Sequence, residues 1–259
     1  MRNSRPRRPV SNRARLPVVG FPSDKSPAPG GQREPSEPQR PQSGGLTGRL
    51  DAPRLGEIYT RTAAFYDGLV AELQAKAKLE ALAALARRPG ERCLEAGVGT
   101  GWAFERLVAA SGAEGAFGID LAAGMLEVAR GRLGARAAGR LLLGDARRLP
   151  FAAATFDCLL STYTLEVMLE ADIEAAVADF LRVLRPGGRA VIVNLTEGEG
   201  GDAAMIEDWE RRYLRDPEAF GGARPLRLQA LLRAKGFEAV ERRYVGGPWP
   251  SEVLACRRP

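Results

Sequence analysis

The chain has 259 residues, of which 45% are hydrophobic and 27% are charged, and its formal net charge is +6. This length accommodates one α/β domain with a complete core and additional segments. Histidine is absent, which excludes histidine-based catalytic triads, histidine proton shuttles and histidine-ligated metals, and we predict no metal site.

Residues 1–45 account for the whole net positive charge, because basic and acidic side chains balance over residues 46–259. These 45 residues also contain nine of the 18 prolines and almost no apolar clusters, so they cannot bury enough surface to offset their ordering entropy. We predict a disordered, basic, Pro-rich tail. Arg7-Arg8 does not begin an export signal, since the short apolar run that follows contains Pro17 and Gly20. The tail is either solvated or adheres to anionic lipid or nucleic acid.

Cysteine usage and hydropathy bear on the compartment. Cys93, Cys158 and Cys256 lie in separate apolar runs without C-x-x-C spacing, which favours buried, reduced thiols. No segment approaches the roughly 18 consecutive apolar residues of a membrane span. We therefore expect a cytoplasmic protein, with peripheral contact to an anionic membrane as an open alternative.

The folded part begins with Pro53 to Arg88, which reads as two helices; the second, Leu69–Arg87, ends before the stop signal Pro89-Gly90. Strands and helices then alternate. The strand-like runs are Arg92–Ala96, Gly115–Asp120, Arg140–Leu143, Thr155–Ser161 and Arg189–Leu195. The helical runs are Gly101–Ala110, Ala123–Leu133 and Asp172–Leu184. This alternation predicts a parallel sheet covered by helices on both faces, with right-handed crossovers.

The last third of the chain has a different pattern. Ala203–Leu214 and Pro225–Lys235 are predicted helices, and Phe237–Tyr244 is a predicted strand. A turn at 246–248 then leads to a final strand, Ser251–Cys256. Two strands joined by a turn suit an antiparallel hairpin at the end of the sheet. The Gly/Glu-rich segment Thr196–Gly201 predicts a mobile loop.

Residues 95–101 read E-A-G-V-G-T-G between an apolar strand and a helix, a pattern typical of a nucleotide-cofactor loop. Gly97, Gly99 and Gly101 let the backbone approach a cofactor closely and adopt positive φ. The spacing does not fit the dinucleotide pattern G-x-G-x-x-G, because the third glycine position falls on Trp102 or, in the other register, on Phe104.

Acidic residues also end the next two strands. Asp120, in Gly-Ile-Asp, is placed to accept hydrogen bonds from both hydroxyls of a ribose; its alternative role is to cap the following helix. Asp145 follows the third strand and is placed to accept from an adenine amino group, while the Ala146 N–H meets a ring nitrogen. Because ligands bind beyond the carboxyl ends of parallel strands, these positions predict one nucleotide site.

The fourth strand ends at Ser161, and the backbone carbonyls there are placed to receive an ammonium group. The later segment L-R-P-G-G, residues 184–188, is a helix-to-strand turn in which proline stops the helix and the glycines allow the reversal. We assign this segment to structure and not to chemistry.

Over roughly Leu55 to Pro259 the ordered set E-x-G-x-G-x-G, G-I-D, G-D-A-x-x-L-P-F, F-D and L-R-P-G-G resembles the small-molecule and lipid branch of class I S-adenosylmethionine-dependent methyltransferases. The stretch L-E-A-G-V-G-T-G looks most like bacterial phosphatidylethanolamine N-methyltransferases and less like quinone C-methyltransferases. The resemblance implies an α/β, Rossmann-like, seven-stranded, mostly parallel sheet with helices on both faces and a C-terminal antiparallel hairpin. It implies S-adenosyl-L-methionine as the cofactor.

The resemblance also implies site residues. The positions carried over as cofactor contacts, together with those we add from the same loops, are Glu95, Gly97, Gly99, Gly101, Asp120, Leu121, Asp145, Ala146 and Ser161. Glu95 would face the cofactor ammonium. Tyr59 and Tyr66 match residues that cover the methionine end in relatives, although packing on a helix face explains them equally well. Relatives often have a histidine after the fourth strand, where this chain has Leu165-Glu166-Val167.

A sulfonium methyl is strongly electrophilic, so the enzyme mainly supplies proximity, alignment and desolvation. Glu166, or a carboxylate of the Glu197–Glu199 loop, is the candidate general base for a hydroxyl or carbon acid. We expect residues 46–259 to form the methyltransferase domain, with a helical cap at 46–88 and a substrate cover at 196–225. Trp209, Tyr213 and Phe220 either line an apolar pocket there or pack inward.

Three functions stay open from the sequence. The favoured one is methyl transfer to a small molecule or lipid, such as a phospholipid amine head group or a quinone precursor. The second is methylation of protein or nucleic acid; against nucleic acid, residues 46–259 are charge-neutral and lack the N/D-P-P-Y motif. The third is cofactor binding without catalysis.

Overall fold

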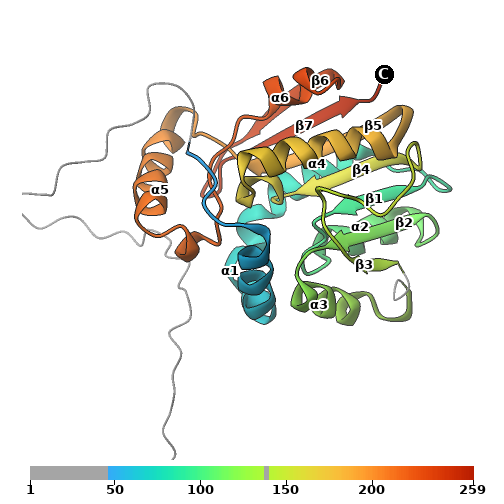
Figure 1. The fold of residues 1–259 in the computed structure, drawn as a ribbon, viewed down its shortest axis with the longest axis horizontal. Coiled ribbons are helices and arrows are strands. Elements are labelled where there is room, and N and C mark those ends of the chain that lie inside the picture. Colours follow the sequence, from blue (N-terminus) through green and yellow to red (C-terminus); the bar gives the residue numbers. More distant parts are fainter. Residues whose placement is uncertain (1–45, 137–139) are drawn as a thin grey trace, which may run out of the picture.

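The computed structural model of the protein describes residues 46–136 and 140–259 (Figure 1). The predicted tail at 1–45 lies outside the described residues. No helix within the described ranges has the length and apolar character that a membrane crossing requires. All three cysteines are buried and none forms a disulfide, as their apolar surroundings predict.

Seven strands form one mixed sheet in the order β3-β2-β1-β4-β5-β7-β6. The strands are β1 (Cys93–Ala96), β2 (Ala116–Asp120), β3 (Leu141–Leu143), β4 (Phe156–Thr162), β5 (Leu184–Leu195), β6 (Glu238–Val245) and β7 (Ser251–Arg257). Neighbours from β3 to β5 pair in parallel, and β7 pairs antiparallel with both β5 and β6. The predicted fold class, including the closing hairpin, is confirmed.

Helices cover both faces of this sheet (Figure 1). The helices are α1 (Ala52–Leu85), α2 (Trp102–Ser111), α3 (Ala123–Leu133), α4 (Glu170–Val183), α5 (Ala203–Arg215) and α6 (Gln229–Ala234). Because side chains alternate along a strand, Cys158 and Leu160 of β4 pack with α1, α2 and α3, whereas Leu159 packs with α4 and α6. The sequence therefore builds two apolar cores, one on each face.

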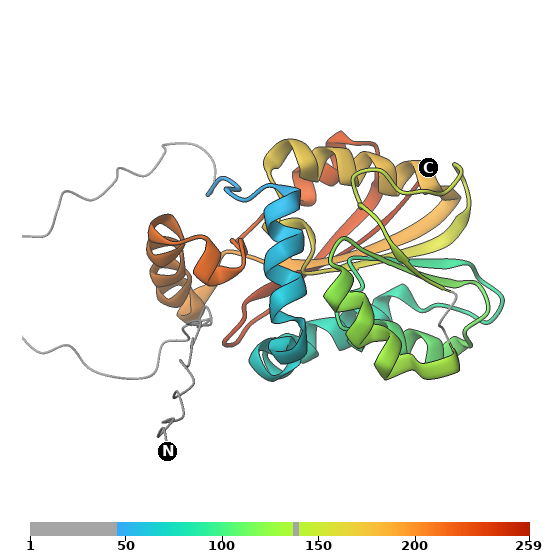
Figure 2. The ribbon, with the colours of Figure 1, turned by 60° about the horizontal axis from the view of Figure 1, so that its bottom comes forward.

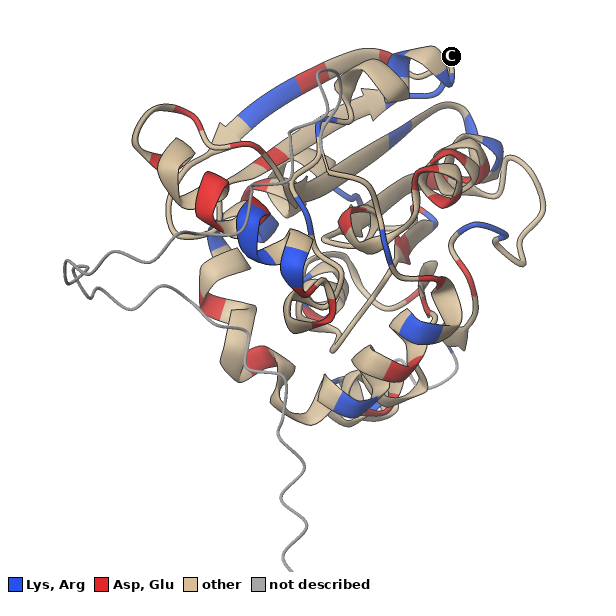
Figure 3. Cartoon of the chain, turned by 60° about the vertical axis from the view of Figure 1, so that its left-hand side comes forward, with Lys and Arg blue, Asp and Glu red and all other residues tan. Residues whose placement is uncertain are grey.

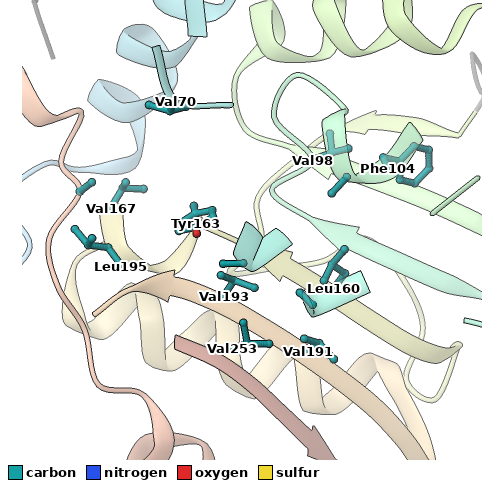
Figure 4. Close-up of a cluster of buried hydrophobic side chains, with 14 of the residues drawn as sticks. Val70, Val98, Phe104, Leu160, Tyr163, Val167, Val191, Val193, Leu195 and Val253 are labelled. Atoms are coloured by element: carbon teal, nitrogen blue, oxygen red, sulfur yellow. The ribbon is translucent and has the colours of Figure 1, made fainter. Parts of the chain in front are cut away.

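The first of these cores reaches the carboxyl ends of the central strands. Figure 4 shows Val70 of α1 on the opposite side of the cluster from Tyr163, Val193 and Val253, which belong to the sheet or to the end of β4. The long helix α1 thus packs over the strand ends, and Figure 2 shows it crossing them in front of the sheet.

The N-terminal helical region differs from the prediction, because one helix runs from Ala52 to Leu85 where the sequence suggested two. Asp51 caps its start by accepting a hydrogen bond from the Arg54 N–H at 2.9 Å. Gly68 does not interrupt the hydrogen bonding, but Figure 2 shows the helix changing direction between its blue and its teal part. Tertiary packing of the second half therefore overrides the break that the pattern indicated.

The bounds of β5 and α6 also differ from those predicted from the sequence. Strand β5 begins at Leu184, directly after α4, because Leu184 already pairs with Phe156; the predicted turn is an irregularity inside the strand, with Gly187 at φ +72. The predicted helix at 225–235 is shorter, since the backbone before it is tied to the sheet by a hydrogen bond from the Leu226 N–H to the Leu195 carbonyl at 2.9 Å.

Candidate active site

A cavity of about 970 Å³, counted with its open mouth, lies at the carboxyl ends of β1, β2, β3 and β4, under α1. Sequence order reverses between β1 and β4 in the sheet, so the cavity lies at the switch point where open α/β sheets bind ligands. The predicted site residues that line it are Tyr59, Tyr66, Glu95, Gly97, Gly99, Asp120, Leu121, Asp145 and Ala146. Gly101, Ser161 and Glu166 are not among the lining residues.

The three glycines of the loop do different work. At Gly97, which has φ +78, a Cβ would overlap the side chain of Thr164. At Gly99, with φ +54, a Cβ would meet no protein atom within 4 Å, so the backbone borders open space. Gly101 does not face the cavity: it precedes α2, and a Cβ there would lie 3.0 Å from the Ala129 Cβ of α3. The third glycine therefore serves helix packing.

Asp120 holds the loop in place from the end of β2. Its Oδ2 accepts a hydrogen bond from the Gly99 N–H at 2.7 Å, and its Oδ1 accepts from the Ala122 N–H at 2.9 Å. Burial raises the pKa of this carboxyl, against the effect of these backbone donors. It is not the cap of α3, since Ala122 occupies that position. Each carboxylate oxygen keeps a second lone pair for a ligand hydroxyl.

Glu95 is a buried carboxyl group with unused hydrogen-bonding capacity. Its side chain is 1% exposed and lines the cavity, and its Oε2 has no hydrogen-bond partner among the described residues. Burial raises the pKa of Glu95 to about 8, although the nearby Lys78 charge opposes the shift. An unpartnered buried carboxyl is costly to the fold unless a ligand satisfies it.

Asp145 lies at the far end of the cavity and is held by Arg147. The Arg147 Nε is 2.9 Å from Asp145 Oδ2, and its Nη1 donates to Asp172 at 2.9 Å. Burial acts to raise the pKa of Asp145, but the Arg147 hydrogen bonds and charge keep it below its ordinary value. Arg147 also lines the cavity, a role that the sequence reading did not assign.

At the end of β4, the cavity is lined by the residues that follow Ser161. The Ser161 side chain is 1% exposed and donates to the Ala96 carbonyl at 3.0 Å, which ties β4 to β1. Because alternate residues of a strand face opposite ways, Thr162 lines the cavity instead, followed by Tyr163 and Thr164. The Tyr163 hydroxyl is 2.7 Å from the Ser251 hydroxyl of β7.

Glu166 is held by the backbone of Leu195 and the side chain of Arg224. Its Oε2 accepts from the Leu195 N–H at 2.6 Å, and its carbonyl accepts from the fully buried Arg224 guanidinium at 2.9 Å. Burial raises the pKa of Glu166 to about 8. Its contacts are those of a residue that fastens β5 to the loop after β4.

The aromatic residues of the predicted cover pack inward, which decides between the two readings that the sequence left open. Trp209, Tyr213 and Phe220 are buried and do not line the cavity. The Trp209 ring lies 4.6 Å from that of Phe220 and 5.0 Å from that of Trp249, measured between centroids.

Tyr59 and Tyr66, in contrast, both line the cavity from α1, with ring centroids 5.9 Å apart. The Tyr59 hydroxyl donates to the Gly221 carbonyl at 3.1 Å. Tyr59 thereby joins α1 to the segment that follows α5.

Sequence reasoning missed one polar face of α1. Gln74 and Lys78 follow Asp67 by seven and eleven residues, which places the three on one side of a helix, and this periodicity was the available signal. Asp67 accepts a hydrogen bond from the Thr100 hydroxyl at 2.6 Å and forms an ion pair with Arg132 of α3. Lys78 is buried and lines the cavity beside Glu95.

The cavity suits a nucleoside that carries an amino-acid group. Open space above Gly99 allows close backbone approach, and Asp120 and Asp145 offer acceptors along one wall. The orphaned Oε2 of Glu95 offers an acceptor for an ammonium. These residues fit S-adenosylmethionine, with its adenine, ribose and methionine parts, and the fold and site together define a class I methyltransferase.

Comparison with known proteins also places the chain among methyltransferases. A family model described as a methyltransferase domain matches residues 93–188. The chain is 32% identical over 224 residues to a malonyl-[acyl-carrier protein] O-methyltransferase of Methylococcus capsulatus, covering 85% of this chain and 78% of that protein. It is 39% identical over 160 residues to the Serratia marcescens enzyme of the same name, covering 61% of this chain and 60% of that one.

A solved structure adds support for the fold. An S-adenosylmethionine-dependent methyltransferase of Thermotoga maritima, described as a possible histamine N-methyltransferase, superposes with a TM-score of 0.57. It is 24% identical, and the match covers 78% of this chain and 99% of that one. The chain belongs to the class I S-adenosylmethionine-dependent methyltransferases, and it spans 60% of the length of the S. marcescens relative.

Proposed function

We propose that this methyltransferase acts on a small molecule or lipid whose reacting end enters an apolar pocket beside the cofactor. The observation that carries the proposal is the composition of the cavity wall away from the glycine loop. Four apolar residues form that wall together with Tyr59 and Tyr66, namely Ala52, Leu55, Val167 and Met168. Such a wall favours an apolar acceptor over a charged polymer.

For the cofactor, we propose that Asp120 accepts from the ribose hydroxyls and that Asp145 and the Ala146 N–H meet the adenine. Glu95 would receive the methionine ammonium, and Gly97, Gly99, Leu121 and Tyr66 would contact the remaining surface. We propose no cofactor contact for Gly101 or Ser161, since neither lines the cavity.

When bound, the cofactor supplies an electrophilic methyl group on a sulfonium. The residues of the chain align the acceptor with that methyl and exclude water. The described lining carboxylates are Glu95, Asp120, Asp145 and Asp172. Asp145 and Asp172 are paired with Arg147, Asp120 accepts from two backbone N–H groups, and Glu95 is assigned above to the cofactor ammonium. We propose neither these residues nor Glu166 as a base. This arrangement favours an acceptor atom that arrives with a free lone pair, such as a carboxylate oxygen or an unprotonated amine.

The malonyl-[acyl-carrier protein] O-methyltransferases among the relatives favour a second, more specific acceptor: a carboxylate on an acyl chain borne by a carrier protein. Its oxygen would form the new bond to the methyl carbon as the bond from that carbon to sulfur breaks, and no proton would need to leave. An acyl chain also suits the apolar wall. The match covers only 60% of the S. marcescens relative, and we therefore propose this acceptor from the similarity and the apolar wall together.

A single assay separates these acceptors. Purified full-length chain is incubated with methyl-labelled cofactor and, in parallel, a malonyl-carrier protein, phosphatidylethanolamine vesicles and a demethylated quinone. Label in any one fraction identifies the acceptor. Label in none, together with calorimetric binding of the cofactor, would favour cofactor binding without catalysis.

We also propose that the protein is cytoplasmic and contacts membranes at most peripherally, through the basic segment 1–45. Figure 3 shows acidic and basic residues interspersed over the face in view, which does not favour docking of nucleic acid there. Flotation with anionic liposomes tests the membrane contact. Unchanged flotation after deletion of residues 1–45 would remove that segment from the proposal.

A further inference from the structure

Lys78 presents a positive charge inside the cofactor cavity. It lies near the end of α1, is 9% exposed and lines the same cavity as Glu95. Its Nζ lies 5.8 Å from the centroid of the Trp102 ring and 5.4 Å from that of Tyr163. Trp102 begins α2 directly after the glycine loop, and Tyr163 follows β4, so Lys78 is located where the loop and the β4 end meet.

This charge is not neutralised by a direct contact. Among the described residues no side chain forms a hydrogen bond or an ion pair with the Lys78 ammonium. Burial lowers the pKa of Lys78 to about 8, while the negative charges of Glu95, Asp67 and Glu166 oppose that shift. The ammonium borders the cavity in a largely desolvated setting, so an anion bound in the cavity would stabilise its charged form.

We propose that Lys78 binds the α-carboxylate of the methionine part of S-adenosylmethionine and makes the site specific for cofactors that carry it. The inference rests on the proposed placement of the cofactor, with its ammonium at Glu95. The methionine end is a zwitterion, with an ammonium and a carboxylate on one carbon. A buried carboxyl group and a buried ammonium that face one cavity complement both charges.

Position on α1 favours the cofactor over the acceptor as the partner of Lys78. The α1 residues of the apolar wall proposed for the acceptor run from Ala52 to Tyr66, and even Tyr66 precedes Lys78 by about three helical turns. Lys78 instead neighbours Trp102, at the start of α2. Since the N-terminus of a helix favours an anion, Lys78 and α2 would attract the carboxylate together.

The test measures ligand affinity by calorimetry, which is independent of turnover. Lys78→Met keeps the aliphatic stem and removes the charge, and Lys76→Met, on the exposed side of the same helix, is the matched control. The ligands are S-adenosylmethionine and S-adenosylhomocysteine, which carry the carboxylate, and decarboxylated S-adenosylmethionine and 5′-methylthioadenosine, which lack it.

We expect Lys78→Met to weaken binding of the first two ligands by about tenfold to hundredfold, the range for a lost charge-assisted hydrogen bond, and to change the last two less than twofold. Lys76→Met should change none. Equal weakening for all four ligands would overturn the proposal, because it indicates a structural role. Unchanged affinities would overturn it as well, as would a change confined to the KM of the acceptor.

If the Lys78→Met variant does not fold, the proposal can still be tested by comparing two ligands on the wild-type protein. The wild type should bind S-adenosylmethionine at least tenfold more tightly than its decarboxylated form, and equal affinities would refute the role of Lys78. If the wild type binds none of the four ligands, the proposed cofactor placement fails, which is a different outcome from a failure at Lys78 alone.

Discussion

The Asp67 side chain of α1 accepts a hydrogen bond from the Thr100 hydroxyl at 2.6 Å, and so connects the N-terminal helix to the glycine loop of the cofactor cavity. The same carboxylate pairs with Arg132 of α3, whose Nε donates to the Thr100 carbonyl at 3.0 Å. Three elements are therefore fastened around one loop residue. The helix that precedes the sheet is part of the site and not only a cover.

We predict that Asp67→Ala weakens S-adenosylhomocysteine binding by about tenfold and destabilises the fold by about 1–3 kcal/mol, because Thr100 and Arg132 lose their acceptor. Calorimetry and thermal unfolding measure the two effects. Asp208→Ala is the control, since it removes a carboxylate that pairs on α5 with Arg211 and Arg212. Equal affinities for Asp67→Ala and the wild type would show that the loop does not need this contact.

Gly97→Ala should abolish cofactor binding, since the new Cβ would overlap Thr164 and the residue has φ +78. Gly131→Ala, in the last turn of α3 with no atom within 4 Å of the added Cβ, is the control. It should bind normally and gain about 0.5–1 kcal/mol of stability from the better helix former. Normal cofactor binding by Gly97→Ala would contradict the close packing of Gly97 against Thr164 in the glycine loop.

The buried Glu95 predicts a pH-dependent difference in stability. Its pKa in the folded protein is about 8, above its ordinary value of 4.5. Between these pH values the unfolded chain has released the proton and the folded chain keeps it, so this group lowers stability as the pH rises from about 4.5 to about 8.

Because Gln does not titrate, Glu95→Gln should gain stability relative to the wild type over that interval, by on the order of 3 kcal/mol between pH 5 and pH 9. Thermal or denaturant unfolding of ligand-free protein at several pH values measures the difference. Glu91→Gln, at an ion pair with Arg189, should show no such rise with pH. A difference that stays constant with pH would mean that Glu95 is not desolvated.

Glu166→Gln should keep methyl transfer within about threefold of the wild type, because the amide oxygen can still accept from the Leu195 N–H and the residue is not proposed to move a proton. The measurement is kcat with the acceptor found in the labelling assay. A loss of a hundredfold or more, the range expected for a general base, would restore the catalytic role that the sequence suggested for Glu166.

The sheet and the strand-end acidic residues could be predicted from the sequence, since the alternation of strands and helices and the spacing of Glu95, Asp120 and Asp145 are local patterns. The sequence did not distinguish Gly97 and Gly99 from Gly101, because their different neighbours come from β4 and from α3. Which face of β4 meets the cavity decides between Ser161 and Thr162, and that register is set by pairing.

The contribution of α1 was the least predictable part of the site. Asp67 and Lys78 lie in an Ala-rich segment, where polar residues usually face solvent. The burial of Lys78 and the partial burial of Asp67 depend on a helix that packs over strands distant in sequence. The inward packing of Trp209 depends in the same way on Phe220 and Trp249. Such contacts arise from tertiary structure and leave only a weak periodic signal.

Calorimetric titration of the full-length protein with S-adenosylhomocysteine tests the central claim, that the cavity at the strand ends holds this cofactor. We predict one binding site with a dissociation constant in the micromolar range or below, lost in Gly97→Ala and retained in Gly131→Ala. No binding heat and no thermal stabilisation of the wild type at millimolar ligand would contradict it, as would equal binding by the Gly97→Ala variant.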